Sequence, residues 1–328
     1  MKRSLWLLAV AGLAAVCLLS LLVGTKSIPV AEIWAALCGD DSSPDHLIVT
    51  EYRVPRTLLG LLAGVALGVA GCLMQGLTRN PLADPGLLGI NAGAAFAITV
   101  AVAFFGIGEI TSYVWFGFAG AAIVSVAVYR LGTAGRRGTD PVRLTLAGVA
   151  LTAVLSGLTK GLILLNATAF DEMRQWDSGA LTGRGYAIIA GAAPFIGVGV
   201  IAAVIAARSL NAVALGDDLA RALGVRVGRT RLLTAVALTL LCGTATAAVG
   251  PIAFVGLAVP HIARWIVGPD QRWILAFSML LAPTLVLGAD VVGRIIIRPA
   301  EIPAGLVTAF LGAPVLIWLA RRPQVSAA

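Results

Sequence analysis

The feature that most constrains this chain is the length of its apolar runs. The first, residues 4–23, reads SLWLLAVAGLAAVCLLSLLV and has no charge over a length that can cross a bilayer as a helix. Similar runs recur along the chain and raise its mean hydropathy to +0.95. The apolar residues stand in continuous blocks instead of alternating with polar ones, which excludes transmembrane β-strands. The sequence therefore predicts an all-α polytopic membrane protein, in which residues 1–328 form one transmembrane domain.

The number of spans follows from the spacing of these runs. The N-terminal run begins like a signal peptide, but no small-x-small cleavage site follows it, and we interpret it as a retained span. Gly60, Gly64 and Gly68 recur at four-residue spacing, a pattern that lets helix backbones approach closely. We predict about ten transmembrane helices, at residues 4–23, 58–78, 87–105, 111–129, 143–165, 187–207, 231–249, 251–267, 273–293 and 303–319.

The distribution of basic residues predicts the orientation of these spans. With the N-terminus inside the cell, sixteen of the 24 Lys and Arg residues fall in inner segments and seven in outer ones. Positive residues accumulate on the cytoplasmic side of membrane proteins, so both termini are predicted to be cytoplasmic. This topology accounts for the net charge of +8, and we predict no nucleic-acid partner beside the membrane lipid.

The residues that carry catalysis or hold metals in other proteins are scarce here. The chain has two histidines and four cysteines, and the cysteines show no metal-binding or disulfide spacing. It also lacks the glycine-rich phosphate loop with its lysine that ATPases of the P-loop class need. We therefore predict that the chain is not an enzyme, has no catalytic or metal-binding residues and binds no cofactor.

A charged stretch, LGDDLARALGVRVGRTR at 215–231, interrupts two apolar spans. Acidic residues at its start and a glycine after two turns favour a short amphipathic helix. From the pattern alone, this segment is either a solvated loop with some helix or a docking element for a soluble protein. Its candidate docking residues are Leu215, Asp217, Asp218, Leu219, Arg221, Ala222, Leu223 and Gly224.

A second unusual stretch, LTRNPLADPGLLG at 77–89, places Asn80 and Leu82 between two prolines and an aspartate. Proline and asparagine are turn residues, so a tight connection would look similar. Broken backbone at membrane depth is also tolerated where it lines a cavity. Both interpretations stay open on the pattern alone.

Four basic residues lie in unexpected places. Arg53 and Arg56 fall on the predicted outer face, and Arg294 follows Asp290 by one helical turn. Either Asp290 and Arg294 form an intrahelical ion pair, or Arg294 and the other two arginines form a basic surface for an acidic partner. Lys160 lies near the outer end of a span, where it either snorkels to the interface or faces a cavity and assists an anionic cargo.

Four motifs, in order along the chain, carry a resemblance to a known family. YRVPRTLLGLLAG, QGLTRNPLADPGLLGINAGA, GPIAFVGLAVPHIARWIVG and ADVVGR…AEIPAGLVTAFLGAPVLIWL resemble the iron-siderophore and cobalamin permease subunits of ABC importers. The resemblance covers residues 50–322. It implies the type II ABC importer permease fold in the inner membrane of a bacterium and a ferric siderophore, enterobactin or another catecholate, as cargo.

The resemblance also implies partners and roles. Residues 215–224 would be the cytoplasmic coupling helix on an ATPase dimer that binds ATP and Mg. Arg53, Arg56 and Arg294 would dock an extracytoplasmic siderophore-binding protein, and Asn80 and Leu82 would belong to the inner gate. A second permease subunit, identical or paralogous, would complete the pore.

The resemblance has one departure and leaves alternatives. The family's second gate strip has small hydroxyl residues where this chain has Pro141 and Val142, so that gate is not transferred. Another cargo of the family, such as a hydroxamate siderophore, haem or cobalamin, is the nearest alternative. An ATP-independent secondary transporter is a further one, although charge within the spans is nearly absent.

Overall fold

The computed structural model describes residues 2–39, 45–133 and 141–321, and every regular element in these ranges is a helix. Seven helical segments are long and apolar enough to cross a membrane, and three shorter apolar helices accompany them. The long segments are α1 (Lys2–Leu22), η1 (Ile48–Arg53) with α3 (Val54–Thr78), α5 (Ile110–Thr133), α6 (Pro141–Leu165), α8 (Tyr186–Ala214), α10 (Val227–Leu238) with η3 (Thr239–Gly243) and α11 (Thr244–Val249), and α13 (Gln271–Ile296). The shorter ones are α4 (Ile90–Phe105), α12 (Val255–Val267) and α14 (Ala304–Ala320).

Each of the ten predicted spans therefore corresponds to a helix, and the all-helical fold class is confirmed. The predicted boundaries are wrong in places. The span predicted at 251–267 starts only at Val255, because Gly250 and Phe254 have positive φ values of 78° and 67° and interrupt the helix. The four remaining elements are short and were not predicted as spans: α2 (Val30–Leu37), η2 (Pro85–Leu88), α7 (Ala167–Asp177) and α9 (Asp217–Ala222).

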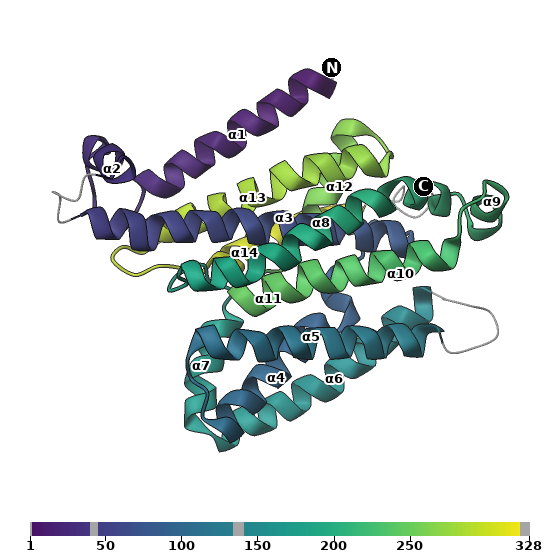
Figure 1. Cartoon of the computed structure of the whole chain (residues 1–328), viewed down its shortest axis with the longest axis horizontal. Helices are drawn as coiled ribbons and strands as arrows, with labels where there is room; N and C mark the ends of the chain where they lie inside the picture. Colours follow the sequence, from purple (N-terminus) through teal and green to yellow (C-terminus); the bar gives the residue numbers. More distant parts are fainter. Residues whose placement is uncertain (1, 40–44, 134–140, 322–328) are drawn as a thin grey trace.

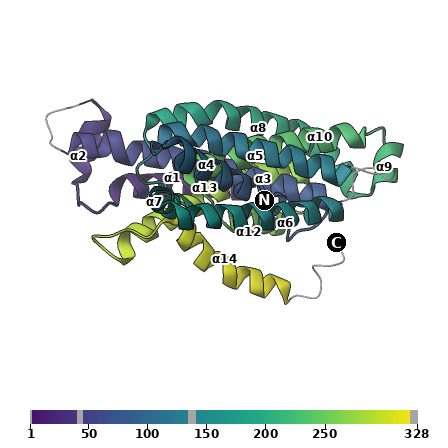
Figure 2. The same cartoon turned by 90° about the horizontal axis from the view of Figure 1, so that it is seen from below.

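The long helices run roughly parallel to the long axis of the molecule (Figure 1). One end carries α9 and the turn between α12 and α13, whereas α2 and α7 lie at the opposite end (Figures 1 and 2). We call these the α9 end and the α7 end. In the view of Figure 1, α4, α5 and α6 pack together below the group formed by α3, α8, α10 and α13.

The centre of the fold is α3, which is buried over most of its length. It packs against α13 through the predicted glycine row. A Cβ on Gly64 would lie 2.3 Å from the Cα of Pro283, and one on Gly68 would lie 2.5 Å from the Cβ of Ala282. These separations are too short for a side chain, so the prediction of close backbone packing at this row is confirmed.

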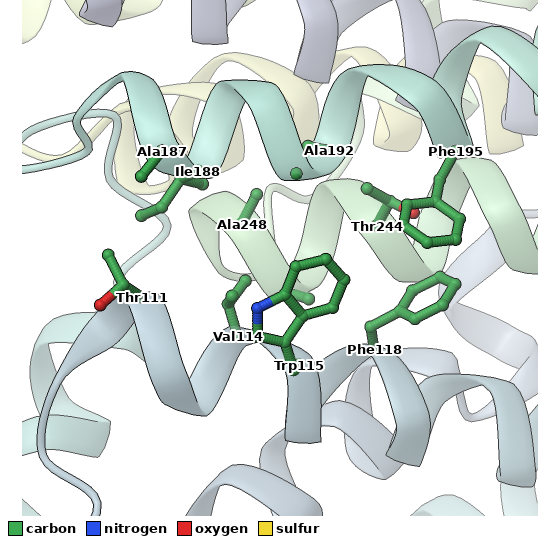
Figure 3. A pocket seen from close by; sticks show the side chains of 12 residues that line it. Thr111, Val114, Trp115, Phe118, Ala187, Ile188, Ala192, Phe195, Thr244 and Ala248 are labelled. Carbon is green, nitrogen blue, oxygen red and sulfur yellow. The ribbon is translucent and has the colours of Figure 1, made fainter.

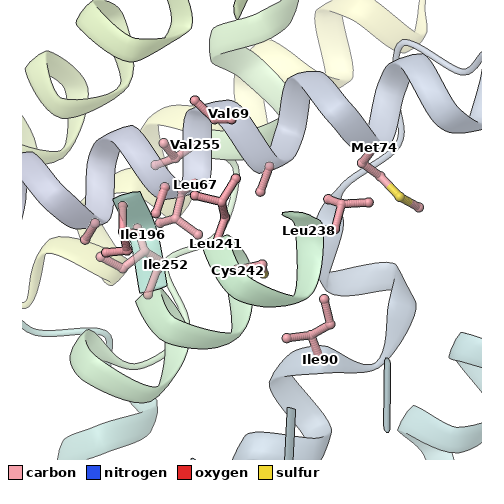
Figure 4. Close-up of a cluster of buried hydrophobic side chains, with 14 of the residues drawn as sticks. Leu67, Val69, Met74, Ile90, Ile196, Leu238, Leu241, Cys242, Ile252 and Val255 are labelled. Atoms are coloured by element: carbon pink, nitrogen blue, oxygen red, sulfur yellow. The ribbon is translucent and has the colours of Figure 1, made fainter. Parts of the chain in front are cut away.

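Aliphatic side chains from α4, α8, the α10–α11 segment and α12 fill the space beside α3. Figure 4 shows Leu67 and Met74 of α3 close to Leu238 and Leu241, which belong to the α10–α11 segment. The π-helical turn η3 lies at this point and directs Leu241 into the core, where it is fully buried. One cluster of buried side chains therefore connects these helices.

Candidate functional site

The charged stretch 215–231 forms the short helix α9 at one end of the molecule. Gly216 and Gly224 flank it with φ values of +111° and +81°, which gives sharp turns before and after the helix. The side chains of Leu215, Leu219 and Leu223 are 62%, 51% and 63% exposed. Leu219 and Leu223 lie one turn apart along one side of α9, and Leu215 precedes the turn at Gly216. The helix thus presents an exposed row of leucines, as a docking element would.

The acidic start of α9 is tied to the rest of the chain. Arg231 of α10 donates to both carboxylate oxygens of Asp217, over 3.0 and 2.9 Å, and Arg79 forms a second ion pair with Asp217. Arg221 pairs with Asp218 over 2.7 Å, on the exposed side of the helix. Asp217 therefore anchors α9, while Asp218 faces outward. Sequence reasoning missed Arg79 and Arg231, because no local pattern links them to Asp217.

The predicted gate loop follows directly from Arg79, which ends α3 in the left-handed conformation at φ 53°. Asn80 Oδ1 accepts a hydrogen bond from the Leu82 N–H over 2.9 Å, which makes a tight local turn. Asp84 accepts from the Gly86 N–H over 2.8 Å, and burial raises the pKa of the Asp84 carboxyl. Asn80 is exposed and Leu82 is half-buried, so the loop lies at the α9 end, joined to α9 by the Arg79–Asp217 pair.

The three predicted docking arginines lie together near the α7 end, where Asp290 joins two of them. Arg56 donates to Asp290 over 2.8 Å and to Glu301 over 2.7 Å. Arg294 donates from Nε to the same aspartate over 3.1 Å, so the predicted intrahelical ion pair is present. We call Arg56, Asp290, Arg294 and Glu301 the four-residue ion cluster.

Burial limits what these arginines offer to a partner. Arg294 is 1% exposed and donates to the backbone oxygens of Ser20 and Val23, over 2.7 Å each. Arg53 is 5% exposed and donates to the backbone oxygens of Leu21, Leu22 and Lys26. In this conformation the two side chains fix α1 and the segment after it, in contrast to the exposed surface expected from the sequence. Their docking role stays a prediction.

Two cavities open at the α7 end. The first, of about 520 Å³, borders the ion cluster. The second, of about 700 Å³, is lined in part by residues of α7. Arg184 borders both, is 7% exposed, and its Nε has no hydrogen-bond partner among the described residues. Burial lowers the pKa of the Arg184 guanidinium, and the nearby Tyr113 and Glu172 oppose this shift. No local pattern in the sequence distinguishes Arg184 from the other arginines predicted on the outer side.

Lys160, the predicted cargo contact, lies on an exposed part of α6. It is close enough to Asp177, at the end of α7, for its charge to act on that carboxyl. Burial raises the pKa of Asp177, and the positive charge of Lys160 opposes the shift. Lys160 is thus near the α7 end of its helix and has an acidic neighbour.

A third cavity, of about 140 Å³, lies between α5, α8 and α11. Figure 3 shows Trp115, Phe118 and Phe195 facing it, with Thr111 and Thr244 as its polar lining residues. Small-molecule sites usually enclose about 300–1,000 Å³, so this space is too small for a siderophore. Within the described ranges, no three His, Cys, Asp or Glu side chains lie where they could hold a metal ion together.

Comparisons with known proteins agree with this architecture. Residues 12–322 match the FecCD transport family. The chain is 51% identical over 304 residues to the ferric enterobactin transport system permease protein FepD of Escherichia coli (strain K12), covering 93% of this chain and 91% of FepD. FepG, a permease protein of the ferric enterobactin transport system in the same strain, is 38% identical over 298 residues, covering 90% of this chain and 89% of FepG.

A solved structure described as an inward-facing conformation of a metal-chelate type ABC transporter has the same fold. It superposes with a TM-score of 0.86 at 26% identity and covers 97% of this chain and 99% of its own. The arrangement of ten apolar helices, α9 and the helices at the opposite end is therefore that of an ABC transporter permease.

Proposed function

The chain belongs to the FecCD transport family, and from this premise we propose that it is the permease subunit of an ABC importer for a ferric siderophore. The observation that carries the proposal is the 51% identity to FepD over 93% of this chain. The cargo we propose is ferric enterobactin or a similar catecholate, carried through the cytoplasmic membrane. The chain itself performs no covalent chemistry, and ATP and Mg bind to a separate ATPase subunit.

We propose that the α9 end faces the cytoplasm. The support is the excess of arginine in the segments at this end and the exposed leucines of α9. In this role α9 is the coupling helix, and Leu215, Leu219 and Leu223 insert into a cleft of the ATPase. The anchoring of Asp217 by Arg79 and Arg231 passes a movement of α9 to the loop of Asn80 and Leu82, which we propose as part of the inner gate.

At the α7 end, we propose that a siderophore-binding protein docks over the ion cluster. All three predicted arginines border the 520 Å³ cavity, but Arg56 is the best placed, because it is the only one of the three that is not buried and its partners Asp290 and Glu301 are carboxylates. Acidic side chains of the binding protein would compete with these carboxylates for the arginine. Such charged contacts mainly steer encounter and fix register.

The pore requires a second permease subunit. FepD and FepG are two permease proteins named for one transport system in one organism, which supports a paralogous partner for this chain. Lys160 is proposed to face the cargo path, where its positive charge favours an anionic ferric catecholate. Its exposure on α6 and the neighbouring Asp177 support a position near the α7 end of that path.

The test is uptake of radiolabelled ferric enterobactin by intact cells with and without this gene, beside a ferric hydroxamate and cobalamin. We expect loss of enterobactin uptake alone, restored by the gene. Leu219→Asp, which puts a charge in the exposed leucine row, should insert normally but fail to restore uptake or to retain the ATPase subunit. Loss of uptake of a different cargo would mean that this cargo is the substrate. Uptake that is insensitive to ATP depletion would contradict the proposal of an ABC importer.

A further inference from the structure

A groove opens at the α9 end between the last turns of α8 and the first turns of α10. It has a volume of about 640 Å³, larger than the aromatic cavity and as large as many ligand sites. Figures 1 and 2 show α8 and α10 side by side, with α9 beyond their ends. Residues that line the groove include Ile205, Ser209, Arg226, Arg229, Leu232 and Val236.

The lining of the groove is positively charged at the start of α10 and aliphatic further along the helix. Arg226 precedes the first residue of the helix and Arg229 follows within its first turn, whereas Leu232 and Val236 come one and two turns later. Their spacing of three or four residues places all four on one side of the helix. With a rise of 1.5 Å per residue, the cationic and aliphatic ends are roughly 10 Å apart.

The two arginines at the groove differ from the nearby Arg221 and Arg231 in having no counter-ion among the described residues. Both are exposed, and across the described ranges neither guanidinium forms an ion pair or a hydrogen bond. Among the described residues that line the groove, none is acidic. The nearby Asp217 and Asp218 are already held by other arginines. The groove thus keeps two uncompensated positive charges at one end.

We propose that this groove binds an anionic phospholipid of the leaflet at the α9 end. The lipid phosphate lies between Arg226 and Arg229, because arginine forms charge-assisted hydrogen bonds to phosphate oxygens. One acyl chain follows Ile205, Leu232 and Val236, all of which are exposed aliphatic side chains. Basic pockets between helices at the membrane surface bind anionic headgroups in this way.

The aliphatic part of the groove favours a lipid over an acidic protein as the occupant. Ile205 and Val236 belong to helices long and apolar enough to span the membrane, and each lies nine residues from the end of its helix at the α9 end. A soluble partner at the α9 end would reach only the charged end of the groove. A phospholipid can occupy both ends at once, because the distance from its phosphate to its acyl chain is similar to the distance between the cationic and aliphatic ends of the groove.

The experiment measures lipids that stay bound to the purified chain by native mass spectrometry, with phosphatidylglycerol and phosphatidylcholine as probes. We expect the chain to retain phosphatidylglycerol preferentially. The double variant Arg226→Gln/Arg229→Gln should lose this retention, by about fivefold for each arginine removed. Arg226→Lys/Arg229→Lys keeps both charges and should retain most of it. The matched control Arg272→Gln/Arg321→Gln removes two exposed arginines from the same end and should change nothing.

Several outcomes would overturn the proposal. Equal retention of phosphatidylcholine would show that the groove does not select an anionic headgroup. Displacement of the lipid by inorganic phosphate or glycerol 3-phosphate alone would show that the aliphatic wall contributes nothing. If the glutamine variant kept the lipid but lost the ATPase subunit, the arginines would face a protein. A melting temperature unchanged in a zwitterionic detergent excludes misfolding as the cause of lost retention.

Discussion

At the scale of single residues, the structure assigns different roles to two adjacent aspartates. Asp217 is held by Arg79 and by Arg231, whose side chain is only 8% exposed, whereas Asp218 forms an ion pair with the exposed Arg221. Asp217→Asn removes the carboxylate that both arginines bind, and we expect a loss of about 1–3 kcal/mol in stability. Asp218→Asn should leave stability unchanged, since surface ion pairs contribute little.

A comparison of the two variants separates the effect of losing the contacts that anchor α9 from the effect of losing one negative charge on α9. Thermal unfolding in detergent measures the stability loss, and ATPase stimulation in the assembled importer measures coupling. We expect Asp217→Asn to lower both, because the link from α9 to the Asn80 loop depends on this carboxylate. Equal effects of the two asparagine variants would mean that the Arg79 and Arg231 contacts do not hold the helix.

How far the sequence predicts the site depends on sequence separation. The Asp290–Arg294 pair is four residues apart on one helix, and this spacing made an intrahelical ion pair one of the two interpretations of the sequence. Arg56 is separated from Asp290 by 234 positions, and no periodicity reports such a contact. The burial of Arg53 and Arg294 depends on the position of α1, which is also a tertiary property. Local patterns therefore identified the arginines but not their carboxylate and backbone partners.

At the scale of elements, the contact between α3 and α13 is the most sensitive to added volume. A Cβ at position 64 would lie 2.3 Å from the Cα of Pro283, which belongs to the backbone and cannot turn aside. We expect Gly64→Ala to destabilise the protein by about 1–3 kcal/mol through overpacking. Gly197→Ala in α8 meets nothing within 4 Å and should be neutral or stabilising. Melting temperatures in detergent compare the two, and a stable Gly64→Ala would contradict this packing.

The helices themselves were predictable, because a span needs only a sufficient apolar length, which is a property of the sequence alone. Their ends were less so. α8 continues to Ala214, beyond the predicted boundary at 207, since its last turns pack beside α10 and remain helical outside the apolar run. The short helices α2 and α7 escaped prediction, because neither has the length of a span.

At the scale of the whole molecule, the two ends differ in a way that tests the orientation. Cys38 follows α2 and is exposed, whereas Cys72 and Cys242 are buried and Cys17 lies within α1. A membrane-impermeant maleimide added to spheroplasts should therefore label the natural chain, and Cys38→Ser should abolish the signal. In that serine background, Leu223→Cys places a thiol on the exposed row of α9. It should react only in inside-out vesicles if the arginine-rich end faces the cytoplasm, as proposed. Labelling of Leu223→Cys from outside would invert the molecule and make coupling to a cytoplasmic ATPase impossible.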